Sequence, residues 1–205
     1  EAYITKIMPR KNDLIRPFDM VEMDKAAEKM VLAYIIGKFE ENKGNKIDWI
    51  WIIYASLFDL LKKIALCDIK APIQQMLKKE YPEEYLRLNE WVLNQYKTLL
   101  SDEKLFSKFT IYFGQNAGSF SIPDELKTTV RVYRAAHKFS SIRELQMISV
   151  VNEKERLGSI DKELQAEIQP YLDLEGLQKL ITHQKAFDFL LKIEQLRFQT
   201  RWNQT

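Results

Sequence analysis

The residues of this chain that could carry out chemistry are few in kind. There are 29 Asp and Glu residues, but only two histidines, His137 and His183, and one cysteine, Cys67. Because acids in helical proteins mostly lie on solvated faces, a carboxylate becomes a candidate only where its surroundings are unusual. Asp59 meets that condition, since it lies within the most apolar stretch, residues 47–67. A carboxylate buried there must find a partner or stay protonated.

The cations nearest to Asp59 in the sequence are Lys62 and Lys63, one helical turn further on. We therefore predict that one of them pairs with Asp59. A second arrangement of acids is Asp24 with Glu28, four residues apart on one helix face. That pair could clamp a metal ion, but the neighbouring lysines, Lys25 and Lys29, make a solvated charged face an equally good interpretation.

The motifs of the common catalytic classes are absent. The sequence has no glycine-rich phosphate loop, no HExxH, no CxxC and no GxSxG. Cys67 has neither a histidine neighbour nor a helix start that would lower its pKa, so we expect no cysteine nucleophile. A single cysteine cannot form an internal disulfide, and the first residues show no signal-peptide pattern, which favours a cytoplasmic location.

Composition and charge exclude several classes of partner. Lys and Arg number 31 against 29 acids, the formal net charge is +2, and the two signs are interleaved, so we predict no nucleic-acid binding. The apolar stretch 47–67 is interrupted by charged residues, which argues against a membrane span. With 46% hydrophobic residues in 205, the chain is expected to fold as one domain over residues 1–205.

The elements that must position these side chains are helices. Apolar residues recur at three- and four-residue spacing, and glycine and proline occur only six times each, which predicts an all-α, compact multi-helix bundle. A first helix should run from Asp19, with Glu22 completing its cap, to Gly44. A second, from Asp48 to Leu66, is apolar on nearly all sides and should be the central, most buried element. The expected inner face of the first helix is Met20, Met23, Ala27, Met30, Val31 and Tyr34.

Later segments also read as helices. A run of loop-forming residues, 114–123, separates them and is interpreted as a surface loop within one domain. Helices are expected after Pro72 and over residues 82–100, 103–113, 123–155, 159–169 and 173–202.

Residues 48–72, DWIWIIYASLFDLLKKIALCDIKAP, resemble the central motif of the HD-domain phosphohydrolases, in particular the 5'-deoxynucleotidases. In that family a buried helix carries an apolar run followed by His-Asp and an acid three residues on. A Gly-Asp-Ile or Gly-Asp-Leu segment and a proline turn come next. This chain has Phe58-Asp59 at the first point and Cys67-Asp68-Ile69 before Pro72 at the second.

Two other segments extend the resemblance to residues 10–155, with the helices of 159–202 packing on it. Residues 21–25, VEMDK, place Asp24 where the family has its first metal-binding histidine. Residues 132–138, VYRAAHK, place His137 at the family's last metal-binding aspartate, whereas without the resemblance His137 reads as a satisfied core histidine. The resemblance implies an HD-like bundle in which two histidines and two aspartates hold a metal that activates water.

Each departure from that motif weakens the metal site. If a metal were retained, Asp24, Asp59, Asp68 and His137 would be its ligands, and such a set favours Mg²⁺ or Mn²⁺. The register is open: Asp59 matches either the family's aspartate or its histidine, and the following acid is then replaced by Lys62 or Lys63. The interpretation that we favour is a structural ion pair in place of the metal, with no cofactor.

The sequence therefore predicts a catalytically impaired HD-like protein, a pseudoenzyme that keeps a pocket for a nucleotide, another phosphorylated ligand or a protein partner. The first alternative is an active, divergent phosphohydrolase acting on nucleoside monophosphates, in which Asp59, Lys62 and Lys63 occupy the catalytic positions. The second is a helical protein-interaction domain. Arg10 and Arg16 lie where relatives hold the substrate phosphate, and the resemblance also implies a homodimer.

Overall fold

The computed structural model describes residues 15, 17, 21–66, 69 and 71–183. Across these residues the regular structure is helical and no β-strand forms, so the all-α prediction is confirmed. The elements are α2 (Glu22–Asn42), α3 (Trp49–Ala65), α4 (Ala71–Glu80), α5 (Pro82–Tyr96), α6 (Glu103–Ala117), α7 (Asp124–Ile148), α8 (Lys154–Ile168), the 3-10 turn η1 (Gln169–Tyr171) and α9 (Glu175–Thr182).

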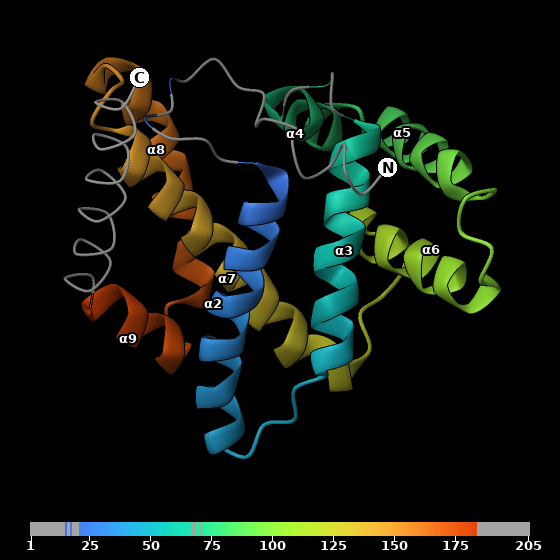
Figure 1. Cartoon of the computed structure of the whole chain (residues 1–205), viewed down its shortest axis with the longest axis horizontal. Coiled ribbons are helices and arrows are strands. Elements are labelled where there is room, and N and C mark those ends of the chain that lie inside the picture. The colour runs from blue at the N-terminus through green and yellow to red at the C-terminus, as the bar shows by residue number, and fades with distance from the viewer. Residues whose placement is uncertain (1–14, 16, 18–20, 67–68, 70, 184–205) are drawn as a thin grey trace, which may run out of the picture.

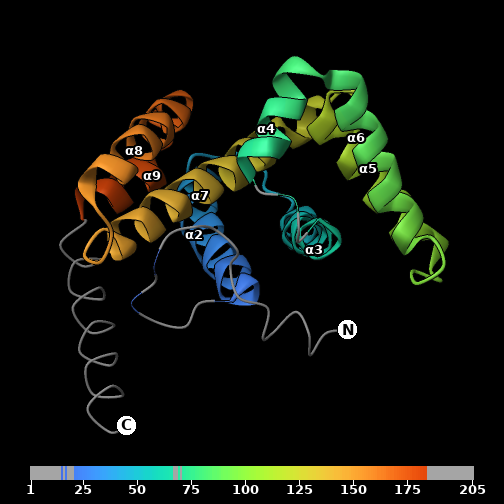
Figure 2. The ribbon, with the colours of Figure 1, turned by 90° about the horizontal axis from the view of Figure 1, so that it is seen from above.

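Three helices form the centre of the bundle (Figure 1). α2 and α3 lie side by side in opposite directions, and α7 packs across both of them. α9 contacts α2 and α8 contacts α7, whereas α5 and α6 lie next to α3 on the other side, as the view from above shows (Figure 2). Side chains of α2, α3 and α7 therefore meet in the middle of the molecule.

The ends of the two central helices follow from local chemistry. The Asp48 side chain accepts a hydrogen bond from the Trp51 N–H at 2.9 Å, which caps α3 where the sequence predicted. α2 ends at Asn42, and Gly44 follows with φ of 87°, a left-handed conformation that favours glycine and confirms the predicted end. The predicted start at Asp19 lies outside the described residues.

The predicted inner face of α2 was wrong. Met23, Met30, Val31 and Tyr34 are between 36% and 60% exposed, and Ala27 is exposed as well; Met20 is outside the described residues. The buried face consists of small, aliphatic and charged residues: Glu22, Lys25, Ala26, Lys29, Leu32, Ala33, Ile36, Gly37 and Glu40.

Two physical reasons explain this reversal. Small residues allow α3 to approach closely, since a Cβ on Gly37 would lie 2.6 Å from the Trp49 ring. The long charged side chains bury their methylene stems while their charged ends reach partners inside the bundle.

α3 is not the most buried helix either. Its residues Ile50, Ile53 and Leu57 are between 40% and 62% exposed, whereas α7 has buried residues along most of its length. The buried side of α3 joins an aromatic core with α6, in which the Phe58 and Phe109 ring centroids lie 4.8 Å apart. Burial of these rings supplies much of the hydrophobic stabilisation between the two helices.

Later boundaries differ by a few residues from those predicted. α5 ends at Tyr96, and α6 continues to Ala117, which shortens the predicted loop to residues 118–123. α7 ends at Ile148 rather than near residue 155, because the Asn152 side chain donates to the Ile148 carbonyl at 2.8 Å. α8 begins at Lys154 and α9 ends at Thr182, beyond which most of the predicted helix 173–202 is outside the described residues.

The prediction that residues 1–205 form one domain stays a prediction. Among the described helices, none combines the length and the apolar composition needed to cross a bilayer.

Candidate functional site

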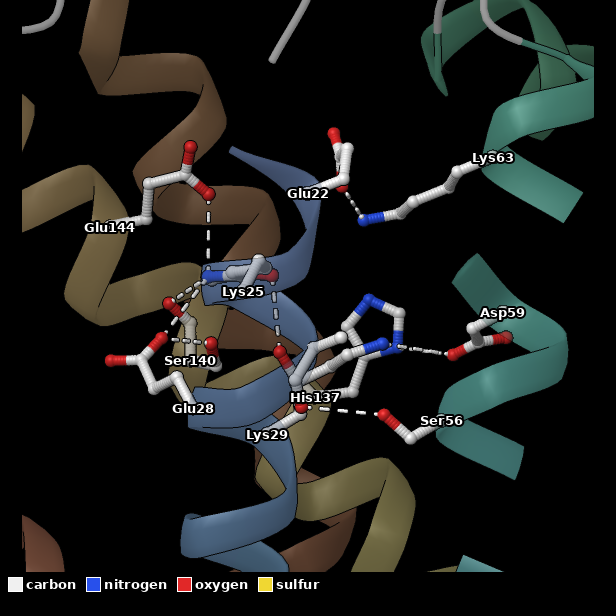
Figure 3. A network of polar contacts seen from close by, with 12 residues as sticks. Glu22, Lys25, Glu28, Lys29, Ser56, Asp59, Lys63, His137, Ser140 and Glu144 are labelled. Carbon is white, nitrogen blue, oxygen red and sulfur yellow. Dashed lines mark hydrogen bonds and ion pairs between the residues drawn. The ribbon is translucent and has the colours of Figure 1, made fainter. Parts of the chain in front are cut away.

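The candidate site centres on Asp59, which α3 directs toward α2 and α7 (Figure 3). Lys29 of α2 places its Nζ 3.1 Å from Asp59 Oδ2, and the side chains are 2% and 17% exposed, respectively. Lys29 lies on the same face as Ala33 and Ile36, so helical packing brings its charged end to this point. The prediction of a lysine partner from α3 itself was wrong, because the partner comes from α2.

Two tyrosines complete the surroundings of the Asp59 carboxylate. Tyr112 of α6 donates its hydroxyl to Oδ1 at 2.6 Å, and Tyr133 of α7 donates to Oδ2 at 2.7 Å. Lys29 also lies 3.3 Å from the Tyr133 hydroxyl. Both carboxylate oxygens therefore have short, partly charge-assisted hydrogen bonds from three different helices.

These contacts fix the ionisation of the site. Burial raises the pKa of Asp59, but the Lys29 ammonium, His137 when protonated, and the two tyrosine hydroxyls outweigh it, so the pKa is well below its usual range. Burial and the Asp59 charge raise the pKa values of Tyr112 and Tyr133 well above 10. At neutral pH the site is therefore an ion pair of aspartate and ammonium with two neutral phenols.

His137 of α7 is the outer member of the site. Its Nδ1 lies 3.8 Å from Asp59 Oδ2, and its side chain is 40% exposed. Partial burial and the Lys29 ammonium lower the pKa of His137 well below its usual value, against a smaller opposing effect of Asp59. A neutral imidazole therefore lies at the edge of the site next to solvent.

A second buried lysine, Lys25, lies one turn before Lys29 on α2. Its Nζ donates to the Ser140 carbonyl and lies 3.3 Å from Glu144 and 3.7 Å from Glu28. Glu28 in turn accepts hydrogen bonds from the Ser140 hydroxyl and from Arg143. The contact of α2 with α7 therefore contains a buried polar network, whereas the sequence left a metal clamp and a solvated charged face as the two interpretations of this part of α2.

Asp24 does not join the site. It is exposed, and its Oδ2 accepts a hydrogen bond from the Val21 N–H at 3.0 Å, which caps the start of α2. Residue 24 lies on the outer side of the helix while Lys25 and Lys29 face inward, so the metal-binding role expected for Asp24 gains no support and stays a prediction.

Lys62 and Lys63 lie close to Asp59 in sequence but point elsewhere. Lys62 donates to Tyr85 Oη at 2.9 Å and to Asn89 Oδ1 at 2.8 Å, both on α5. Lys63 pairs with Glu22 at 2.7 Å on the α2 side. Neither lysine takes the place expected for it beside Asp59: both start from the same face of α3, but their long side chains carry the ammonium groups to other partners.

Phe58, at the position of a family histidine in one register, faces α6 instead of α2. The other predicted residues, Asp68, Arg10 and Arg16, lie outside the described residues.

A divalent metal does not fit the described part of this site. Among the described side chains, no three His, Cys, Asp or Glu residues gather in a way that could hold a metal ion. The ammonium of Lys29 contacts Asp59 where a cation would bind, and a metal ion there would meet a like charge at close range.

Sequence reasoning missed Lys29, Tyr112 and Tyr133. A usable signal existed for Lys29, because a lone acid in an apolar helix needs a cation, and Lys29 repeats with Ala33 and Ile36 at helical spacing. Tyr112 and Tyr133 carried no such signal, since an aromatic residue in an apolar stripe reads as ordinary core.

Comparison with known proteins adds no relative: no family model, no curated protein and no solved structure matches this chain. The HD-like assignment therefore stays a prediction that depends on the three sequence segments.

Proposed function

We propose that this chain is an HD-like helical domain that binds a ligand or partner and does not hydrolyse phosphate esters. The observation that carries the proposal is the Lys29 Nζ, 3.1 Å from Asp59 Oδ2. In the family that the sequence resembles, an aspartate of this kind holds the metal that acidifies the attacking water. Lysine supplies the charge but cannot coordinate and acidify a water molecule.

The approach of Asp59 to His137 supports the HD-like interpretation. The two residues come from separate segments of the resemblance, and their side chains lie 3.8 Å apart on different helices. An accidental resemblance gives no reason for such an approach. The departure of Asp24 from the site supports the loss of hydrolysis, since it leaves the described residues short of ligands.

The ligands that we propose first are nucleotides and other phosphorylated small molecules, which follow from the resemblance. The edge of the site that is open to solvent supports an anionic ligand, because it presents His137, 40% exposed, and Lys63, 33% exposed. Lys63 forms its pair with Glu22 there, so an incoming phosphate would compete with a carboxylate.

A phosphate-release assay tests the proposal. Wild type and Asp59→Ala are incubated with nucleoside monophosphates in the presence of Mg²⁺ or Mn²⁺, and thermal melting is recorded with the same compounds. We expect no release in either protein and a raised melting temperature of the wild type with at least one compound. Release by the wild type that Asp59→Ala abolishes would establish the active alternative instead.

An exposed apolar face favours a second candidate, a protein-interaction domain that pairs with a second copy of itself. Val31 and Tyr34 of α2 and Ile53 of α3 are between 57% and 60% exposed, and the Tyr34 and Trp49 rings lie 5.4 Å apart across the two helices. Exposed apolar patches that span neighbouring elements mark interaction surfaces more often than chance.

Light scattering tests this second candidate. A homodimer through the α2 and α3 face predicts that Val31→Glu and Ile53→Glu each convert the protein to a monomer. The matched control is Val150→Glu, which changes an exposed valine, 55% exposed, in the turn after α7. A wild type that is monomeric at high concentration rules out the homodimer.

A further inference from the structure

A pocket of about 160 Å³ lies between α3, α6 and the start of α7, on the side of α3 that faces away from α2. Its walls include Trp51, Tyr54 and Phe58 of α3 and Tyr112 and Gln115 of α6. The Tyr112 ring separates the pocket from the Asp59 site, since its hydroxyl reaches Asp59 while its ring lines the pocket.

Gln115 is the unusual residue of this pocket. It is 8% exposed, and among the described side-chain atoms its Oε1 is the buried one that has no hydrogen-bond partner. Buried polar atoms are almost always paired, because an unpaired one loses its interaction with water without compensation. The terminal torsion of a glutamine is soft, so the amide can turn its oxygen toward a donor placed in the pocket. The unpaired amide oxygen of this lining residue is therefore an acceptor that a donor on a ligand in the pocket can satisfy.

The volume and the aromatic lining of the pocket indicate the size and the ring character of the ligand. A volume of this size accommodates one benzene-sized ring. Tyr54 and Phe58 already stack with 5.6 Å between their centroids, and Trp51 and Tyr112 are tilted at 5.9 Å. A planar ring among them gains the same offset or edge-to-face contacts.

The exposed side chain of Lys108 lies at the edge of the pocket. Its Nζ is 4.4 Å from the centroid of the Tyr54 ring, within the range of a cation–π contact. Asp48, which also lines the pocket, uses its carboxylate to cap α3, so Lys108 is the charged group at this edge that can meet a substituent of the ligand.

We propose that the pocket between α3 and α6 binds a single-ring aromatic molecule that carries a hydrogen-bond donor for Gln115 and an acidic substituent for Lys108. This site is separate from the Asp59 site and does not depend on the function proposed above.

Binding of three small probes to the full chain tests the proposal by titration under ¹H–¹⁵N NMR. p-Cresol has the ring and the donor, toluene lacks the donor, and 4-hydroxyphenylacetate adds the acid. We expect wild type to bind p-cresol roughly tenfold more tightly than toluene, the size of one good hydrogen bond to a buried acceptor. Gln115→Leu should bring that ratio close to one, and the exposed control Gln95→Leu should leave it unchanged.

The same titration tests the contact between Lys108 and the acidic substituent of the ligand. 4-Hydroxyphenylacetate should bind about three- to fivefold more tightly than p-cresol at low salt, with the difference declining as salt is added. Lys108→Gln should remove the difference, whereas Lys104→Gln, one turn earlier on α6 and also exposed, should keep it.

Thermal melting of the unliganded Gln115→Leu protein shows whether a loss of binding comes from a destabilised fold. If Oε1 is unpaired, replacing the amide with an apolar side chain should leave the melting temperature unchanged or raise it. The proposal is overturned if no probe binds wild type at millimolar concentration, if p-cresol and toluene bind it equally, or if Gln115→Leu lowers the melting temperature by several degrees.

Discussion

The two sides of α3 differ in whether their buried polar atoms have hydrogen-bond partners. On the side toward α2 and α7, Asp59 has a partner for each oxygen, from Lys29, Tyr112 and Tyr133. On the side toward α6, an aromatic pocket is bordered by Gln115, whose Oε1 has no partner among the described residues. α3 thus lies between a site in which both carboxylate oxygens of Asp59 are paired and a pocket in which Gln115 Oε1 has no partner among the described residues.

This difference indicates where a ligand is expected to bind. A ligand that contacts the Asp59 carboxylate itself must first break good hydrogen bonds, because the members of this buried network satisfy one another. A pocket with an unpaired acceptor gains from a ligand, because the cost of leaving that acceptor unpaired has already been incurred in the free protein. Asp59 therefore acts first as structure, and Gln115 as a place for recognition.

The largest effect is expected from breaking the Asp59 network. Asp59→Ala leaves the Lys29 ammonium, 2% exposed, without its counter-charge, and we expect a loss of about 3–5 kcal/mol in the free energy of unfolding. Urea denaturation followed by circular dichroism measures it. The control is Asp124→Ala, which removes an exposed ion pair with Lys127 and should cost far less than Asp59→Ala. Equal losses in the two variants would contradict a structural role for Asp59.

A smaller loss of stability is expected when the hydroxyl of either tyrosine is removed. Tyr112→Phe and Tyr133→Phe each remove one hydrogen bond to the Asp59 carboxylate and should cost about 1.5–3 kcal/mol in unfolding free energy. Because the Tyr112 ring also lines the pocket and is kept in Tyr112→Phe, p-cresol binding should survive that change. Loss of p-cresol binding without loss of stability would place Tyr112 in the pocket alone.

The smallest effect is a pH dependence from His137. Its pKa is lowered in the folded protein, so below about pH 6.5 the unfolded chain binds more protons. Stability should therefore fall as pH decreases from 7 toward 5, and His137→Gln should flatten the curve across this window. The exposed His183→Gln serves as the control. Asp59, whose pKa is also lowered, contributes only further down, below about pH 4.

Most of the fold was predictable from the sequence, and the packing of α2 was not. Apolar spacing, the Asp48 cap and the break at Gly44 indicate where the helices lie. The apolar stripe of Met30 and Tyr34 pointed to the wrong side of α2, because the buried lysines contribute methylene stems and charges that hydropathy counts as polar.

Only part of the candidate site could be predicted from the sequence, for a related reason. A single acid in an apolar helix identified Asp59, and the resemblance placed His137 near it, at 3.8 Å in the structure. Its partners come from α2, α6 and α7, and only tertiary packing brings such distant segments to one carboxylate. Sequence distance favoured Lys62 and Lys63, whose ammonium groups instead contact Tyr85 and Glu22.

The central claim is that the Lys29 ammonium stands where the resemblance implies a metal ion. Titration with Mn²⁺ tests it most directly, because a bound paramagnetic ion broadens the NMR signals of nearby amides. We predict that the amides around Asp59 and His137 broaden no more than those of exposed acidic surfaces. Selective broadening at these two positions in wild type, abolished by Asp59→Ala, would contradict the claim.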